Sequence, residues 1–100
     1  MVHTAQQLQY INTLRRFQQE YGAKYGITRM GIFGSVARGE QREDSDVDVV
    51  LEAPAMSVYT LIGIRHELEE MMNKRVDVVR KSKYMSERFK TRLEREVIYV

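Results

Sequence analysis

The stretch that decides the fold runs from Gly34 to Val50 and reads GSVARGEQREDSDVDVV. Its last residues are predicted to form a strand, in which successive side chains point to opposite faces. Asp46 and Asp48 therefore share one face, about 7 Å apart along the backbone, while Val47 and Val49 point into the core. Packing alone does not explain a strand with carboxylates on one side and valines on the other.

Two carboxylates on one strand face need a partner that offsets their repulsion. Unpaired carboxylates about 4 Å apart repel by about 4 kcal/mol at an effective dielectric constant of 20, a large part of the roughly 5–15 kcal/mol that stabilises a small protein. No lysine or arginine lies between Val47 and Leu51 to neutralise them locally. Oxygen ligands without a nearby histidine or cysteine favour Mg²⁺ or Mn²⁺ over zinc. Asp46 and Asp48 are therefore predicted metal ligands.

The stretch begins with the pair Gly34-Ser35, where a predicted strand passes into a helical turn. Free N–H groups at such a turn bind anions, and glycine lets a phosphate approach the backbone closely. Arg38 could hold a triphosphate, or it could form a structural ion pair with Glu40 or with the aspartates. A phosphate-binding turn followed by a metal-binding strand is the arrangement that nucleotide chemistry requires.

Around this stretch, capping residues and hydrophobic spacing predict alternating helices and strands. The first expected helix begins with the capping box Thr4–Gln7 and ends at Gly22 or Gly26. It is followed by a strand Ile27–Phe33, a helical turn Val36–Arg38, a strand Asp46–Glu52 and a helix capped by Ser57 and ended by Asn73. The last expected elements are a strand Arg75–Arg80, a helix from about Ser86 through Leu93, and an apolar tail Val97–Val100 that could add a last strand.

Apolar residues at spacings of three and four define the buried faces of the two long helices. The first face is Leu8, Ile11, Leu14, Phe17, Tyr21 and Tyr25, and the second is Leu61, Ile64, Leu68 and Met71 or Met72. The tyrosines and methionines are accordingly expected in the core. The predicted fold class is α/β (α+β), with a small mixed sheet and flanking helices in a single domain, residues 1–100.

Composition narrows the chemistry and the location. The chain has 100 residues and no cysteine, which excludes disulfides, zinc–thiolate sites and thiol catalysis. It shows neither a signal-peptide pattern nor an apolar run of the roughly 20 residues that span a membrane, so a cytoplasmic protein is expected. Residues 51–73 carry a net charge of −3 and residues 74–100 a net charge of +5. The basic segment is either a solvated helix face or a surface for RNA or an acidic partner.

The pattern of Gly-Ser, ten residues and Asp-x-Asp resembles the signature of the DNA polymerase β nucleotidyltransferase superfamily. Its fuller form, with Ala37-Arg38-Gly39 and Ser45-Asp46, resembles the smallest branch, the minimal nucleotidyltransferases. The resemblance covers nearly the whole chain, because members of this branch are about this long. The family has a third carboxylate on a later strand, and Asp77 in the strand Arg75–Arg80 matches it.

The resemblance implies an enzyme that moves a nucleoside monophosphate from an NTP to an acceptor hydroxyl and releases pyrophosphate. Asp46 and Asp48 would hold two Mg²⁺ ions, and Asp77 would complete the metal site on the acceptor side. Gly34 and Ser35 would bind the β- and γ-phosphates.

The resemblance also implies a partner. Minimal nucleotidyltransferases of this type are typically antitoxins, paired with a helical HEPN-domain ribonuclease toxin encoded nearby, which they adenylylate. ATP would be the donor, a tyrosine of the partner would be the acceptor, and a homo- or hetero-oligomer would fit this role. These expectations come from the resemblance and not from composition or spacing.

Two other functions stay open on the sequence. The first is a catalytically idle antitoxin that neutralises its partner by contact, although such a protein has no need to tolerate clustered carboxylates. The second is a nucleotidyltransferase that acts on RNA through the basic segment Lys81–Arg95. Modification of a small molecule is less expected, because no second domain is predicted that would enclose the substrate.

Overall fold

The computed structural model describes residues 3–100, and its elements follow the expected order. They are α1 (Ala5–Tyr25), β1 (Arg29–Phe33), α2 (Gly34–Arg38), β2 (Val47–Glu52), α3 (Val58–Met72), β3 (Val76–Arg80), α4 (Glu87–Glu96) and β4 (Ile98–Tyr99). The apolar tail thus contributes a short fourth strand. Within the described residues, no helix combines the length and the apolar character that crossing a membrane requires.

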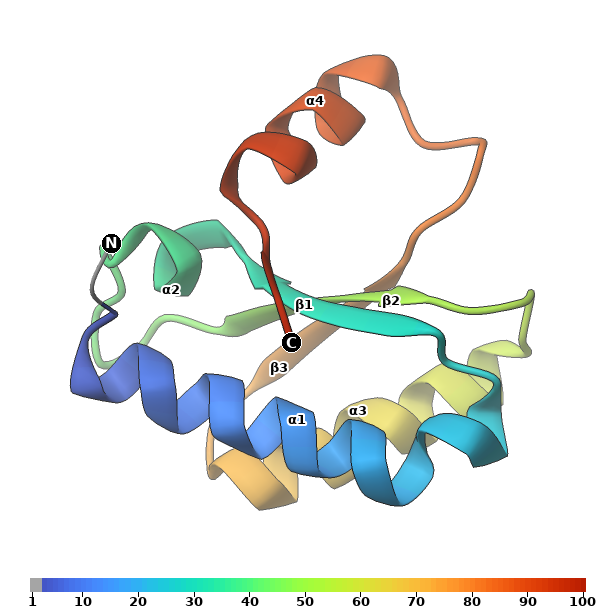
Figure 1. Ribbon diagram of the computed structural model, residues 1–100, viewed down its shortest axis with the longest axis horizontal. Coiled ribbons are helices and arrows are strands. Elements are labelled where there is room, and N and C mark those ends of the chain that lie inside the picture. Colours follow the sequence, from blue (N-terminus) through green and yellow to red (C-terminus); the bar gives the residue numbers. More distant parts are fainter. Residues whose placement is uncertain (1–2) are drawn as a thin grey trace.

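The strands form one mixed sheet in the order β3-β2-β1-β4. β1 runs antiparallel to β2 and to β4, whereas β2 and β3 run parallel. A parallel pair needs a crossover connection, and α3 provides it. α1 and α3 cover one face of the sheet, and α4 lies over the other face (Figure 1). This arrangement confirms the fold class that the sequence predicts.

Local signals set the limits of the long helices. The Thr4 hydroxyl accepts the N–H of Gln7, and the Gln7 side chain accepts the N–H of Thr4, so the predicted capping box is present. Gly26 ends α1 in the left-handed conformation, with φ 69°. Ser57 caps α3 through the N–H of Thr60, and α3 ends at the left-handed Asn73.

The main core lies between the sheet and the helices α1 and α3. Val47 and Val49 are fully buried on this face, as the strand pattern predicts. A smaller apolar cluster forms on the other face around Phe33 and Leu93. There the ring of Phe89 packs edge-on against that of Phe33, with 5.9 Å between the ring centroids. This second cluster anchors α4 on the sheet.

The predicted apolar face of α1 is wrong at Leu8. Leu8 is 46% exposed, whereas Gln7 beside it is only 7% exposed. The Gln7 side-chain amide donates to the carbonyl oxygens of Val36 (2.9 Å) and Ala37 (3.3 Å). These bonds satisfy a buried polar group, and they fix α2 to the first turn of α1.

The expectation that the tyrosines lie in the core is wrong at Tyr59 and Tyr84, which are 83% and 84% exposed. Tyr59 precedes the buried Ile64 by five residues, and this spacing places it off the helix face that Ile64 and Leu68 bury. Tyr84 lies in the segment between β3 and α4, where a helical repeat does not apply.

Candidate active site

Strand pairing brings the predicted carboxylates together. Asp48 pairs with Asp77 in the parallel register of β2 and β3. Paired residues on neighbouring strands point to the same face of a sheet, and side chains alternate along each strand. Because the valines on either side of Asp48 fill the core, Asp48 and Asp77 lie on the opposite face, which carries α4. Asp46 directly precedes β2 and alternates with Val47 onto that same side.

Gly34 lies against Asp48 at the end of β1. Its φ is +73°, and a Cβ atom added there would stand 2.1 Å from Oδ2 of Asp48. Both the left-handed conformation and the lack of space require glycine. The turn that was predicted to bind phosphate is therefore in contact with the carboxylate strand. Ser35 follows Gly34 in α2 and is partly buried.

The carboxylates of Asp46, Asp48 and Asp77 concentrate negative charge around the partly buried Asp48. Burial raises the pKa of the Asp48 carboxyl above its ordinary value, and the charges of Asp77 and Asp46 raise it further. The positive charge of Arg92, on α4, opposes this rise. A bound cation would stabilise the ionised form of a carboxylate that burial and neighbouring negative charges disfavour in this way.

Asp46 also has a cationic neighbour that the sequence analysis missed. Nε of Arg75 lies 3.3 Å from Oδ1 of Asp46, but the Arg75 side chain is 79% exposed, so this ion pair is weak. In residues 3–100 no three Asp, Glu or His side chains converge closely enough to hold one ion in their present conformations. The donor set still fits a hard divalent cation, because Asp46, Asp48 and Asp77 offer only oxygen ligands from one side of the sheet.

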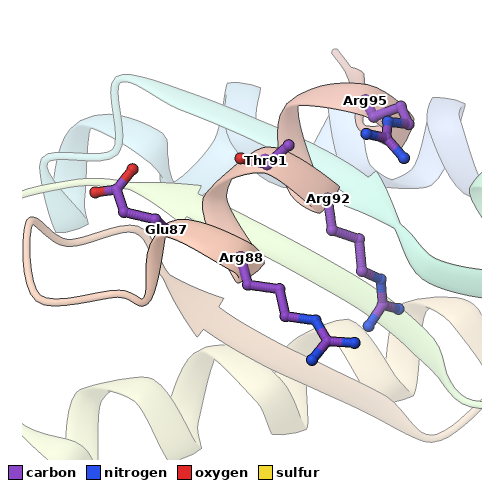
Figure 2. A pocket seen from close by; sticks show the side chains of 5 residues that line it. All are labelled: Glu87, Arg88, Thr91, Arg92 and Arg95. Atoms are coloured by element: carbon purple, nitrogen blue, oxygen red, sulfur yellow. The ribbon is translucent and has the colours of Figure 1, made fainter.

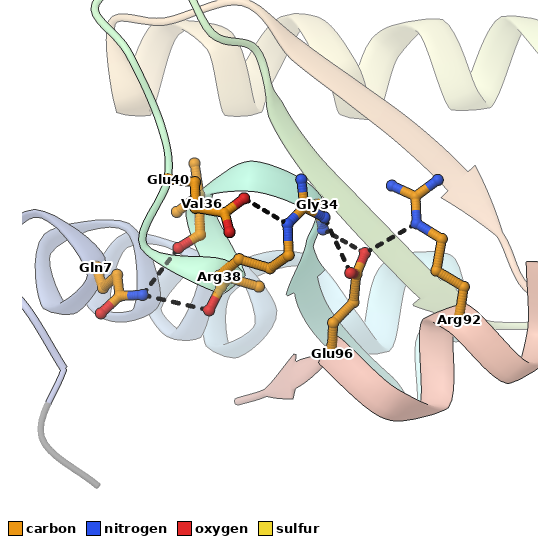
Figure 3. A network of polar contacts seen from close by, with 8 residues as sticks. Gln7, Gly34, Val36, Arg38, Glu40, Arg92 and Glu96 are labelled. Carbon is orange, nitrogen blue, oxygen red and sulfur yellow. Dashed lines mark hydrogen bonds and ion pairs between the residues drawn. The ribbon is translucent and has the colours of Figure 1, made fainter.

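Glu96, at the end of α4, joins the Gly34 turn to two arginines (Figure 3). The backbone N–H of Gly34 donates to Oε1 of Glu96 at 3.0 Å. Nη1 of Arg38 donates to Oε2 of Glu96 at 2.9 Å, and Nε of Arg92 lies 3.3 Å from Oε1. Arg38 also donates to Glu40 at 3.0 Å. The sequence left two roles open for Arg38, triphosphate binding and an ion pair with Glu40 or with the aspartates. The structure contains the ion pair with Glu40, and the second partner of Arg38 is Glu96 and not an aspartate.

The environment of Glu96 favours its charged form. Burial acts to raise the pKa of the Glu96 carboxyl, but the hydrogen bonds from Arg38 and from the Gly34 N–H, together with the charge of Arg92, outweigh burial and lower it. Sequence reasoning missed this contact because Gly34 and Glu96 lie 62 residues apart. The local signals for the network were the helical spacing of Arg92 and Glu96 and the closeness of Arg38 to Glu40 in the sequence.

A row of basic side chains lies on α4 beside this network. Glu87, Arg88, Thr91, Arg92 and Arg95 line a surface hollow of about 460 Å³. Arg88 and Arg92 extend from the helix in the same direction, and Arg95 lies at the far end of the helix (Figure 2). The predicted basic segment therefore presents a cationic border next to the carboxylate face.

Comparison with known proteins identifies the family. The family model described as nucleotidyltransferase domain matches residues 12–100. The chain belongs to the nucleotidyltransferase domain family. It is 40% identical over 88 residues to the protein adenylyltransferase MntA of Thermococcus cleftensis. The aligned region covers 87% of this chain and 88% of that protein. The resemblance that the sequence motif suggests is thus confirmed, and the protein is a nucleotidyltransferase.

Solved structures support the same fold. One described as a "putative minimal nucleotidyltransferase" matches this nucleotidyltransferase with a TM-score of 0.69 and 33% identity, over 88% of this chain and 93% of that chain. Another, of a tri-AMPylated Shewanella oneidensis HEPN toxin in complex with its MNT antitoxin, matches with a TM-score of 0.67 over 94% of this chain and 70% of that chain. The second match has 16% identity and shows the fold alone.

Proposed function

We propose that this nucleotidyltransferase transfers AMP from ATP to a tyrosine hydroxyl of a HEPN-type toxin, and that it acts as the antitoxin of that pair. One observation of the site carries the proposal: Asp48 lies beside Asp77 on one side and against the Gly34 turn on the other. Such an arrangement can hold a metal-bound triphosphate and an acceptor hydroxyl next to each other. The similarity to the protein adenylyltransferase MntA supports a protein acceptor. The fold shared with an MNT antitoxin supports a HEPN partner.

In this proposal Asp46, Asp48 and Asp77 would hold two Mg²⁺ ions. These ions would neutralise phosphate charge and lower the pKa of the acceptor hydroxyl. Gly34, Ser35 and Arg38 would bind the β- and γ-phosphates, which leaves the α-phosphate beside Asp48.

The transfer itself exchanges one bond for another at the α-phosphorus. The tyrosine oxygen forms a bond to that phosphorus, the bond to the bridging oxygen breaks, and pyrophosphate leaves. The hydroxyl proton is lost to a base on the acceptor side, a role that this proposal assigns to Asp77. The protein's main contribution is the alignment of the hydroxyl with the leaving group.

The test is a labelling experiment. The chain is incubated with α-labelled ATP, Mg²⁺, the small helical protein encoded by the neighbouring reading frame, and total RNA. Label is expected on the partner, and it should be lost when the acceptor tyrosine of the partner is changed to phenylalanine. Label that enters RNA while the partner stays blank would replace this proposal with an RNA-directed transferase. Full neutralisation of the partner without any label would favour an idle antitoxin.

A further inference from the structure

The Glu96 carboxylate occupies the donors that the proposed function assigns to phosphate. It accepts the single N–H of Gly34, it pairs with Arg38, and it lies 3.3 Å from Nε of Arg92. A backbone amide with guanidinium groups around it is a typical set of donors for a bound phosphate oxygen. The Glu96 side chain is only 12% exposed, so its carboxylate lies inside this set of donors and not at its edge.

We propose that Glu96 is a built-in competitor of the nucleotide: its carboxylate holds the place of a phosphate group at Gly34 and Arg38, and the nucleotide binds when Glu96 turns away. This inference rests on the proposed function, because it needs the triphosphate to bind at the Gly34 turn. It goes further by assigning to Glu96 a role in setting nucleotide affinity.

The donors cannot serve both anions together. The N–H of Gly34 carries one hydrogen, and Glu96 accepts it at 3.0 Å. The charge of Glu96 already contributes to the raised pKa of Asp48, so a phosphate placed beside both carboxylates would add a third repelling anion. Binding of the triphosphate therefore requires that Glu96 leave the donors.

Glu96 can leave without unfolding α4. The helix is held on the sheet by Leu93, which is 1% exposed, and by the contact between Phe89 and Phe33. Glu96 is the last residue of the helix and also lines a hollow of about 620 Å³, together with Arg38 and Arg95. A rotation of the side chain into this hollow is enough, and Arg95 there offers the carboxylate a cation other than Arg38.

The test compares Glu96→Gln with Glu94→Gln, which removes the same charge from an exposed position of the same helix. Binding of ATP with Mg²⁺, and separately of inorganic tripolyphosphate, is measured by calorimetry. Glu96→Gln should bind both about tenfold more tightly than the wild type, which corresponds to about 1.4 kcal/mol. Glu94→Gln should show only the small change that a screened surface charge gives. Affinity in Glu96→Gln that is no higher than in Glu94→Gln would overturn the inference.

A second measurement uses the wild type and does not depend on how the variants fold. The ¹³C chemical shift of the Glu96 side-chain carboxyl should move toward that of the exposed Glu94 when the protein is saturated with tripolyphosphate. An unchanged Glu96 shift at saturation would contradict the proposed displacement. A wild type that transfers AMP but fails these two tests would overturn this inference alone. Absence of any ATP or tripolyphosphate binding, in the wild type and in Glu96→Gln, would overturn the proposed function and this inference together.

Discussion

At the scale of single residues, Gly34 is the glycine that leaves the least room for a side chain. Gly34→Ala would place a methyl group 2.1 Å from a carboxylate oxygen of Asp48 and would force alanine into a left-handed conformation with φ +73°. The conformation alone costs about 1–2 kcal/mol. The melting temperature should fall by at least about 4–8 °C, and nucleotide transfer should be lost because Asp48 is displaced.

The matched control is Gly63→Ala in α3, where an added Cβ would meet nothing within 4 Å beyond its chain neighbours and the nearby backbone of the helix. Alanine is favoured over glycine in a helix by about 0.8–1.0 kcal/mol, so this variant should melt higher than the wild type and keep full activity. Thermal denaturation of both variants checks the pair. Equal melting of Gly34→Ala and the wild type would contradict the described turn.

Asp48→Asn distinguishes the effect of the Asp48 charge on folding stability from its contribution to nucleotide transfer. Burial and the charges of Asp77 and Asp46 raise the pKa of Asp48, so its ionised form destabilises the folded protein above that pKa. The asparagine variant should therefore be as stable as the wild type, or more stable, at pH 7 in EDTA, and this advantage should disappear at low pH. Nucleotide transfer should fall at least tenfold. Activity above about a tenth of the wild-type level would remove Asp48 from the metal site, since metal catalysis contributes several kcal/mol.

At the residue scale, sequence reasoning identified what a short pattern encodes. Strand alternation and turn formation are local, so the sequence could put Asp46 and Asp48 on one side of a strand and Gly34 at the turn, while their metal- and phosphate-binding roles stay predictions. Glu96 could not be found this way, because its partners belong to distant parts of the chain. The same is true of Arg75, which reaches Asp46 only because β2 and β3 pair.

At the scale of elements, the antiparallel pair of β1 and β2 contains an ion pair that depends on pH. Arg29 lies opposite Glu52 in the register, and its Nη2 is 2.6 Å from Oε2 of Glu52. Burial acts to raise the pKa of Glu52, but the hydrogen bond and charge of Arg29 and the charge of Lys81 lower it overall. A lowered pKa gives stability that is present above the unfolded value, about 4.3, and that is lost as pH falls through the folded value.

Glu52→Gln should therefore lower the urea midpoint at pH 7 and lower it less near pH 2, because the stabilising charge of Glu52 is lost as the pH falls through its folded pKa. Glu70→Gln, at an exposed position of α3, serves as the control and should show a smaller change at either pH. A difference between Glu52→Gln and the wild type that is as large at pH 2 as at pH 7 would indicate lost packing in place of lost charge.

The elements themselves were predicted closely, because their signals are local. The capping box at Thr4 and the cap at Ser57 place the starts of α1 and α3 correctly. Strand limits were less accurate: β1 begins at Arg29 and β2 at Val47, because strand ends depend on which neighbours pair. Leu8 was wrongly expected in the core. Gln7, which forms the predicted capping box, is buried beside it because its amide also donates to the carbonyl groups of α2, a contact that periodicity does not encode.

At the scale of the whole molecule, binding of metal and nucleotide should stabilise the fold. A ligand that binds only the folded state at about 100 times its dissociation constant adds about 2.7 kcal/mol. For a domain of this size that raises the melting temperature by about 10–20 °C. Thermal unfolding with ATP and Mg²⁺ should show this shift, and ATP with EDTA should show much less.

The control for this shift is Asp48→Asn, which should lose the part that depends on Mg²⁺. If none of the four NTPs gave a Mg²⁺-dependent shift in the wild type, the protein would act as an idle binding module. The preferred NTP is the one that gives the largest shift at equal concentration.

Because of the parallel register of β2 and β3, enzymatic activity should report whether these two strands have paired correctly. Asp48 and Asp77 meet only because residue 47 pairs with 76 and 48 with 77. A slip of one residue would turn Asp77 toward the core and Val76 toward solvent, while most of the sheet could still form. Under the proposed assignment, such a misfolded population would be inactive. The specific activity of a refolded sample, divided by that of the native protein, would then count the molecules whose strands paired in the correct register.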